Sequence, residues 1–194
     1  MQNNIKQFFN DRALNWDNHE IRDNTYFIDF VNKNIKINNN DIILDLGCGT
    51  GVITSILKSH TKNIVYGMDI SDKMIEIAKS KVNDPNIRFI CDDFYNTDLS
   101  NIDLIVCHNA YPHFMDKLAF KNKCYNILNN NGRLIICHSI SRESINSCHK
   151  GKEEVSLILK SVDEEASIFT DMFSIINKYE DNNIYLIELK KLES

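Results

Sequence analysis

The sequence predicts an α/β fold in which a doubly wound, mostly parallel sheet of seven strands ends in an antiparallel hairpin. Two observations support this fold class. Five apolar runs rich in β-branched residues alternate with helical patterns, an arrangement typical of parallel strands covered by helices on both faces. The last two strand patterns are separated only by Asp181-Asn182-Asn183, which indicates a tight antiparallel hairpin.

The elements follow one another in a regular order. The expected parallel strands are 41–46, 63–69, 87–91, 102–108 and 133–139, and the expected helices between them are 52–59, 71–82 and 116–128. Ser71 is a favourable N-cap for the second of these helices, and Asn131-Gly132 is suited to close the third. The flanking elements are an amphipathic helix over 8–17, a loop over 141–149, a charged helix over 153–171, and hairpin strands over 173–179 and 184–190.

Length and composition predict one domain with one hydrophobic core. The 194 residues are 43% hydrophobic and 25% charged, and no apolar run approaches the roughly 20 residues of a membrane span. The N-terminal residues lack the apolar stretch of a secretory signal, and the six cysteines include no C-x-x-C pair, so we expect a cytoplasmic protein with reduced thiols. The net charge of −5, with no basic segment, disfavours a nucleic-acid partner and favours a small substrate.

The stretch from Ile42 to Gly51 carries the strongest functional signal. An apolar strand runs into Gly47, Gly49 and Gly51, and a helical pattern starts at the next residue. This geometry leaves backbone N–H groups exposed at a helix N-terminus, where they bind anionic or zwitterionic groups. The spacing differs from the G-x-G-x-x-G of dinucleotide-binding folds, and the carboxylate of Asp45 would repel a pyrophosphate but hold an ammonium group. The pattern therefore favours an amino acid joined to a nucleoside over NAD.

The string D-L-G-C-G-T-G at 45–51 resembles the first motif of class I S-adenosylmethionine-dependent methyltransferases. The resemblance implies a Rossmann-like fold, S-adenosyl-L-methionine as cofactor and S-adenosyl-L-homocysteine as product. It also implies a division of the single methyltransferase domain, 1–194, into an N-terminal helical lid (1–40), a cofactor-binding core (41–140), and a substrate-side loop, helix and hairpin (141–194).

Several strand ends supply expected cofactor contacts. Asp69 ends the second strand about twenty positions after the glycines, so we expect it to bind the ribose hydroxyls, the alternative being a favourable charge at the start of the next helix. The resemblance implies that Asp92, or else Asp93, receives the adenine amino group, and that Asn109 borders the methionine end. Trp16 either faces the sulfonium or packs in an aromatic stripe on the core. The other expected contacts are Cys48, Ile70, Met74 and Phe94.

Histidines follow the fourth and fifth strands. His113, His138 and His149 are expected at one edge of the sheet, together with Arg142. Three interpretations stay open: the imidazoles act as general base or orient the substrate, they bind a divalent metal, or they satisfy loop hydrogen bonds. Arg142 either pairs with a substrate carboxylate or phosphate or is solvated.

We therefore expect an enzyme that transfers the methyl group of S-adenosyl-L-methionine to a small molecule by in-line displacement. The segment after the fourth strand, Asn109-Ala110-Tyr111-Pro112, departs from the N-P-P-Y of nucleobase methyltransferases. The alternatives are a nucleic-acid or protein methyltransferase, a non-catalytic cofactor-binding subunit, and, least favoured, an NAD-dependent oxidoreductase. We expect a monomer or homodimer without a membrane segment, and the sequence does not identify the methyl acceptor.

Overall fold

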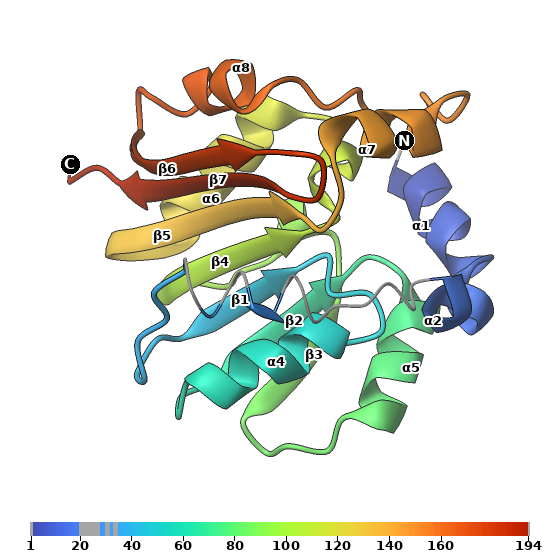
Figure 1. Cartoon of the computed structure of the whole chain (residues 1–194). Helices are drawn as coiled ribbons and strands as arrows, with labels where there is room; N and C mark the ends of the chain where they lie inside the picture. Colours follow the sequence, from blue (N-terminus) through green and yellow to red (C-terminus); the bar gives the residue numbers. More distant parts are fainter. Residues whose placement is uncertain (1, 20–27, 30–31, 33–34, 194) are drawn as a thin grey trace. The chain divides into compact units, whose positions relative to one another are not determined.

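The computed structural model describes residues 2–19, 28–29, 32 and 35–193. These residues form a seven-stranded sheet in the order β3-β2-β1-β4-β5-β7-β6 (Figure 1). The strands are β1 (Ile43–Leu46), β2 (Val65–Asp69), β3 (Ile87–Cys91), β4 (Ile102–His108), β5 (Leu128–His138), β6 (Phe173–Glu180) and β7 (Tyr185–Lys191). The β1–β2, β2–β3 and β4–β5 pairs are parallel, whereas β7 runs antiparallel to both β5 and β6. The predicted fold class is confirmed.

The chain divides into two compact units, which are described separately. Unit 1 is Met1–Thr97 and unit 2 is Asp98–Ser194. The described helices of unit 1 are α1 (Gln2–Asn10), η1 (Ala13–Asn15), α2 (Trp16–His19), α4 (Val52–His60), α5 (Asp72–Lys81) and η2 (Phe94–Asn96). Those of unit 2 are η3 (Tyr111–His113), α6 (Lys117–Ile127), α7 (Arg142–His149) and α8 (Val162–Ser167). The expected organisation as one domain stays a prediction.

In unit 1 the sheet forms the core, and helices cover it. All four residues of β1 are buried, as a strand between other strands requires. Helix α4 packs against β1 and β2, and α5 packs against β2 and β3, while α1 contacts α5. Ser71 caps α5 as expected, because its side chain accepts a hydrogen bond from the backbone N–H of Met74.

In unit 2 the central strands are also apolar and buried. Helix α8 packs against β6 and β7, and α6 packs against β5 (Figure 1). The hairpin is confirmed, with β6 and β7 paired from Phe173–Lys191 to Glu180–Tyr185. Strand β5 begins at Leu128, directly after α6, so Asn131-Gly132 lies within the strand and the prediction that it closes the helix is wrong.

Two further element predictions need correction. The stretch 141–149, expected as a loop, contains α7, whose first turn is capped by the Ser141 side chain. Conversely, the helix expected over 153–171 is reduced to α8. The preceding segment is instead held in place by backbone hydrogen bonds, such as that from Leu157 N to the Pro112 carbonyl oxygen. At the N-terminus, the expected helix over 8–17 is divided into the end of α1, η1 and the start of α2.

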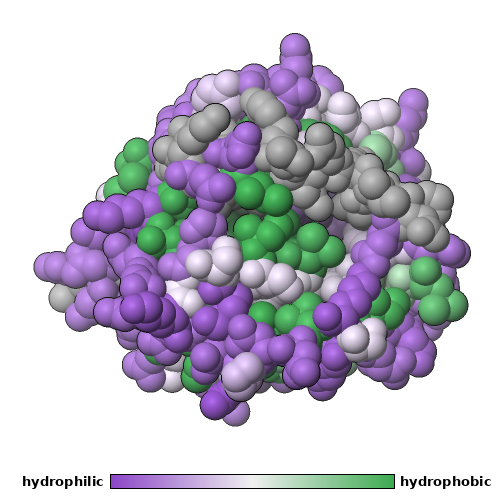
Figure 2. Space-filling view, turned by 60° about the horizontal axis from the view of Figure 1, so that its bottom comes forward, coloured by the Kyte–Doolittle hydropathy of each residue, from purple (hydrophilic) through white to green (hydrophobic). Residues whose placement is uncertain are grey.

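On the face shown in Figure 2 hydrophilic residues predominate, and apolar residues are exposed together near its middle. Leu14 and Ile158 are the most exposed large apolar side chains of the described chain, at 89% and 73%. Among the described helices, none combines the length and the apolar run that crossing a bilayer requires.

Candidate functional site

The glycine-rich loop after β1 has the geometry expected of an amide-lined turn. Gly47, Gly49 and Gly51 have φ angles of 76°, 51° and 82°, which lie in the left-handed region that glycine adopts without steric cost. The backbone N–H groups of Gly47 and Cys48 both donate to the Met68 carbonyl oxygen, at 2.8 and 2.9 Å. The loop is thereby fixed against the end of β2, and α4 begins immediately after Gly51.

Asp69, the last residue of β2, joins this loop to the start of α5. Its Oδ2 accepts the backbone N–H of Gly49 at 2.9 Å, and its Oδ1 accepts the backbone N–H of Ser71 at 2.8 Å. Burial raises the pKa of this carboxyl, and the two backbone donors act in the opposite direction. Each oxygen retains a lone pair, so the carboxylate is able to accept further hydrogen bonds from a ligand hydroxyl.

Asp45 lies in β1 with only 1% of its surface exposed. Burial raises its pKa to about 7, although the Thr54 hydroxyl donates to Oδ2 at 2.6 Å, and the nearby Asp69 raises the pKa further. Burial also raises the pKa of the neighbouring Cys48 thiol, with Asp45 and Asp69 adding to the effect. The loop therefore rests on two buried carboxyl groups that repel each other, an arrangement that favours a cationic ligand group.

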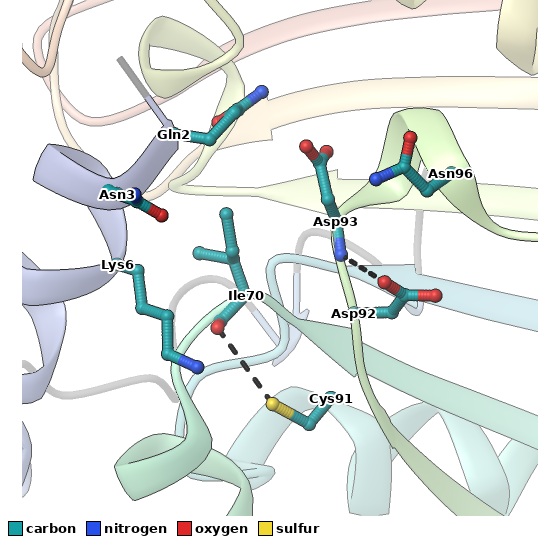
Figure 3. Close-up of a pocket in the computed structure, with 8 residues that line it drawn as sticks. All are labelled: Gln2, Asn3, Lys6, Ile70, Cys91, Asp92, Asp93 and Asn96. Carbon is teal, nitrogen blue, oxygen red and sulfur yellow. Dashed lines mark hydrogen bonds between the residues drawn. The ribbon is translucent and has the colours of Figure 1, made fainter.

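A pocket of about 370 Å³ lies beside the ends of β2 and β3, within unit 1 (Figure 3). It is lined by Gln2, Asn3, Lys6, Ile70, Cys91, Asp92, Asp93 and Asn96. Figure 3 shows the α1 residues on one side, Asp92, Asp93 and Asn96 on the other, and Ile70 between them. Three expected cofactor residues therefore share one cavity. Phe94, by contrast, is buried in η2, and Met74 is buried in α5.

The N-terminal segment is tied to the same end of unit 1. Lys6 forms an ion pair with Asp72 at 2.8 Å. The Thr50 hydroxyl donates to Asp17 at 2.6 Å, and Asp17 also pairs with Lys81.

Trp16 packs against Phe9 beside the glycine loop, and its predicted contact with the sulfonium stays a prediction. It makes an edge-on contact with Phe9, with ring centroids 5.6 Å apart. Its Nε1 also lies 3.6 Å from the point that a Cβ on Gly49 would occupy. Trp16 therefore packs in an aromatic pair and still lies against the glycine loop.

Sequence reasoning missed several residues of unit 1 that hold these groups. Thr54 and Thr50 are each one helical turn or less from the glycines, yet a threonine near a helix start is too common to be singled out. Lys6 lies 66 positions from its partner Asp72, and no local pattern predicts such a pair.

In unit 2, Asn109 connects the ends of β4 and β5. It has a φ of 54°, which asparagine tolerates better than most residues. Its side chain donates to Ser139 Oγ at 3.0 Å and accepts the Ser139 N–H at 3.0 Å. Its own N–H donates to the Cys137 carbonyl oxygen. These hydrogen bonds of Asn109 hold the ends of β4 and β5 together within unit 2. Asn109 is also the residue expected at the methionine end of the cofactor.

His113 and His149 lie against each other. Their ring centroids are 5.0 Å apart in an edge-on arrangement, and His113 Nδ1 donates to the Val155 carbonyl oxygen at 2.8 Å. Burial lowers the pKa of His113 to about 4, and His149 adds to this effect. Burial, together with Lys152, also lowers the pKa of the half-buried His149. Both imidazoles are therefore neutral near pH 7.

His138, the last residue of β5, is 2% exposed. Burial lowers its pKa well below the ordinary value, and His108, His113, His149 and Lys117 contribute in the same direction. Its ring makes an edge-on contact with Tyr185 of β7, at a centroid distance of 5.8 Å. The three predicted histidines of unit 2 therefore interact electrostatically, and sequence reasoning missed Tyr185 because its position follows from strand register.

The predicted roles of Arg142 and of a metal receive no support from the geometry. Arg142 pairs with Glu180 at 3.1 Å and with Glu143 at 3.0 Å, so its charge is already compensated. Within the part of the chain that the structure describes, no group of three or more His, Cys, Asp or Glu side chains is arranged to hold a metal ion. The three-histidine metal interpretation stays a prediction.

A second buried polar group in unit 2 was also not predicted. The Tyr111 hydroxyl donates to Glu165 at 2.9 Å, and both side chains are buried. Lys117 donates to the Tyr111 carbonyl oxygen at 2.6 Å and lies over the Tyr111 ring. A local signal that was not used is the S-x-x-E pattern of Ser161 and Glu164, which forms a capping box at the start of α8.

Comparison with known proteins shows which family this chain resembles. A family model described as a methyltransferase domain matches residues 43–132. Residues 43–132 therefore resemble a methyltransferase domain. A malonyl-[acyl-carrier protein] O-methyltransferase of Priestia megaterium is 27% identical over 81% of this chain and 60% of its own length. The chain spans only 35%, 60% and 44% of the lengths of three such relatives.

Solved structures share the fold. A chain in the Haloferax volcanii complex of the Trm112 methyltransferase activator with a methyltransferase superposes with a TM-score of 0.80 at 14% identity, over 95% of this chain and 98% of that one. The N-methyltransferase NodS of Bradyrhizobium japonicum, in complex with S-adenosyl-L-homocysteine, gives a TM-score of 0.73 at 16% identity, over 98% and 100%. At these identities the likeness concerns the methyltransferase fold alone.

Proposed function

We propose that this chain transfers the methyl group of S-adenosyl-L-methionine to a small-molecule acceptor. The observation that carries the proposal is the link between the glycine loop and Asp69, in which a strand-end carboxylate holds a loop amide beside a helix N-terminus. The match to a methyltransferase domain, and the acceptors of the methyltransferases that the chain resembles, support the same conclusion.

Unit 1 supplies the cofactor contacts in this proposal. The glycines permit close backbone approach, Asp69 accepts the ribose hydroxyls, and Asp45 compensates the ammonium group. Asp92, with Asp93 beside it, receives the adenine amino group in the pocket that Ile70 also lines. Trp16 presents its ring next to the loop, where an aromatic face stabilises a cation. Cys48, Met74 and Phe94 complete the surroundings through their buried side chains.

Unit 2 supplies the groups that act on the acceptor. When bound, the cofactor provides an electrophilic methyl on a sulfonium, so the protein's task is to orient the nucleophile, exclude water and receive a proton where the acceptor carries one. His113, His138 and His149 are neutral near pH 7, and a neutral imidazole is the form that accepts a proton. Their lowered pKa values make them weak bases, which favours acceptors that are already anionic. Asn109 orders the loop that carries His113.

Labelled S-adenosyl-L-methionine tests this function. The full chain is incubated with the labelled cofactor and either malonyl coenzyme A or a metabolite extract, and products are separated by mass. We expect a labelled small molecule, whereas label in added RNA, DNA or protein would contradict the proposed substrate class. A salt-sensitive mobility shift with nucleic acid would point the same way.

A second candidate follows from the Haloferax volcanii complex with an activator protein. A chain of this fold that requires a partner would bind the cofactor without turnover. Cofactor binding by calorimetry, combined with no labelled product in any mixture until a second protein is added, would favour this alternative. The monomeric or homodimeric state and the cytoplasmic location stay predictions.

A further inference from the structure

The indole N–H of Trp16 is a polar group that the proposed function does not use. Trp16 is the single tryptophan of the chain, and its half-buried side chain begins α2. Its Nε1 lies 3.6 Å from the point that a Cβ on Gly49 would occupy. No other described atom outside Gly49 and its two chain neighbours lies within 4 Å of that point. The nitrogen edge of the indole is therefore the part of Trp16 nearest to Gly49, and the space beside this glycine is otherwise open.

Neighbouring contacts fix the position of this indole. Phe9 of α1 packs edge-on against the Trp16 ring. The next residue, Asp17, accepts the Thr50 hydroxyl at 2.6 Å and pairs with Lys81 of α5. Among the described residues the Trp16 N–H has no hydrogen-bond acceptor. The indole is thus held beside the glycine loop with its only polar group available to a ligand.

The backbone of the glycine loop has few donors left for an anionic group. Four of the five N–H groups from 47 to 51 already donate to acceptors in unit 1, namely those of Gly47, Cys48, Gly49 and Gly51. The buried carboxyl groups of Asp45 and Asp69 compensate an ammonium group but repel a carboxylate. A ligand part that carries both groups on one carbon therefore needs a further hydrogen-bond donor beside the loop.

The parts of an adenosyl amino acid differ in what they offer to such a donor. In the proposed function the ribose hydroxyls donate to Asp69, and the adenine lies in the pocket beside β2 and β3, whose lining residues do not include Trp16. The amino-acid part is the one that lies along the glycine loop. An indole N–H is a donor only, and the carboxylate is the strongest acceptor of this part.

We propose that the Trp16 N–H donates a hydrogen bond to the carboxylate of the cofactor's amino-acid part, which makes Trp16 a specificity-determining residue for ligands that keep this carboxylate. This role rests on the proposed function and adds to that of the ring face. The two roles are chemically separate, because the face responds to the charge on sulfur and the N–H responds to the carboxylate. An adenosyl compound without the carboxylate therefore binds more weakly, and its binding does not depend on the indole N–H.

Indole ¹H–¹⁵N NMR of the full chain tests this inference directly, because a single tryptophan gives a single indole signal. The chain is titrated with S-adenosyl-L-homocysteine and with its decarboxylated analogue, the aminopropyl thioether of adenosine, neither of which carries a sulfonium. We expect the indole proton to move saturably downfield with the first compound and not with the second. Equal movement with both compounds, or no movement while S-adenosyl-L-homocysteine binds by calorimetry, overturns the inference alone. Absence of S-adenosyl-L-homocysteine binding overturns the proposed function and the inference with it.

Trp16→Phe keeps an aromatic ring for the contact with Phe9 but has no N–H. It should weaken binding of S-adenosyl-L-homocysteine about tenfold and binding of the decarboxylated analogue much less, since a hydrogen bond to a charged acceptor is lost only with the first compound. The smaller ring affects both ligands, so the comparison between them cancels its effect. Tyr66→Phe, near the start of β2, is the matched control and should leave both affinities unchanged. Equal losses for the two compounds in Trp16→Phe contradict the role of the N–H.

Discussion

The backbone N–H of Gly49 donates a 2.9 Å hydrogen bond to the carboxylate of Asp69, twenty residues further along the chain. The same carboxylate accepts the N–H of Ser71, the N-cap of α5. One side chain therefore fixes both the glycine loop and the start of a helix. In the proposed methyltransferase this carboxylate also binds the ribose, so its loss should affect both stability and cofactor binding.

Replacing Asp69 by Ala should lower the affinity for S-adenosyl-L-methionine by more than about tenfold, because a charge-assisted hydrogen bond is lost. The free energy of unfolding should fall by roughly 1–3 kcal/mol, since two backbone donors lose their acceptor. Asp84→Ala is the matched control: Asp84 accepts the Asn86 N–H in the loop before β3. Calorimetry and denaturant unfolding measure both effects, and an unchanged affinity in Asp69→Ala would remove the ribose assignment.

The raised pKa of Asp45 predicts a pH dependence of stability. The folded state holds the proton up to about pH 7, whereas the unfolded chain releases it near pH 4. Asp45 therefore contributes fully to the free energy of unfolding below about pH 4. This contribution is lost as the pH rises to about 7, and the loss is roughly 4 kcal/mol at most. Asp45→Asn, which keeps an acceptor for the Thr54 hydroxyl, should lose less stability than the wild type between these values. Urea unfolding at several pH values measures this difference. If the free energies of unfolding of the two proteins changed with pH in the same way, the idea of a buried, protonated Asp45 would be contradicted.

His113 has the opposite dependence. Its pKa is lowered to about 4 in the folded protein, so the unfolded chain takes up a proton first as the pH falls. The contribution of His113 to the free energy of unfolding is therefore complete above about pH 6.5. It falls by roughly 3 kcal/mol as the pH is lowered toward 4. His113→Gln should therefore be less sensitive to acid than the wild type. Unfolding curves across this range measure the difference, and a variant that is equally sensitive would show that His113 is not buried in its neutral form.

Gly67 of β2 should tolerate no side chain. A Cβ at this position would lie 2.7 Å from the Phe89 ring and 3.1 Å from the Thr54 hydroxyl, so Gly67→Ala should lower the free energy of unfolding by about 1–3 kcal/mol. Gly151→Ala isolates backbone strain, since its φ is 75° but no atom lies within 4 Å of the added Cβ, and it should lower the free energy by only about 1 kcal/mol. Thermal unfolding of both variants tests the contrast, and a harmless Gly67→Ala would show that β2 and β3 are less closely packed.

The parallel strands and the glycine loop could be predicted because their signals are local. Strand β1, its glycines and Asp69 lie in short apolar runs with regular spacing, and the helix after β2 begins at a recognisable N-cap. The segment 153–161 could not be predicted in the same way. It contains helix-forming residues, but His113 donates a hydrogen bond to the Val155 carbonyl oxygen. The Asn146 side chain also donates to the carbonyl oxygen of Leu159 and accepts its N–H. These are tertiary contacts, and they override local propensity.

In the candidate site, too, some residues could be predicted from local sequence, whereas others are placed by tertiary contacts. Asp69 and Asp92 follow from the rule that ligands bind at strand ends. The partners of Asp45 and of His138 depend on helix packing and on the register between β5 and β7, which pairs His138 with Tyr185. Arg142 was predicted from its residue type, but Glu180 on the hairpin neutralises it, and no local pattern shows such a pair.

Calorimetric titration of the full chain with S-adenosyl-L-homocysteine tests most directly whether the glycine loop and Asp69 bind an adenosyl amino acid. We expect saturable binding at one site, with no comparable heat from NAD at the same concentrations. Binding of NAD but not of S-adenosyl-L-homocysteine, or no binding of either, would contradict the assignment.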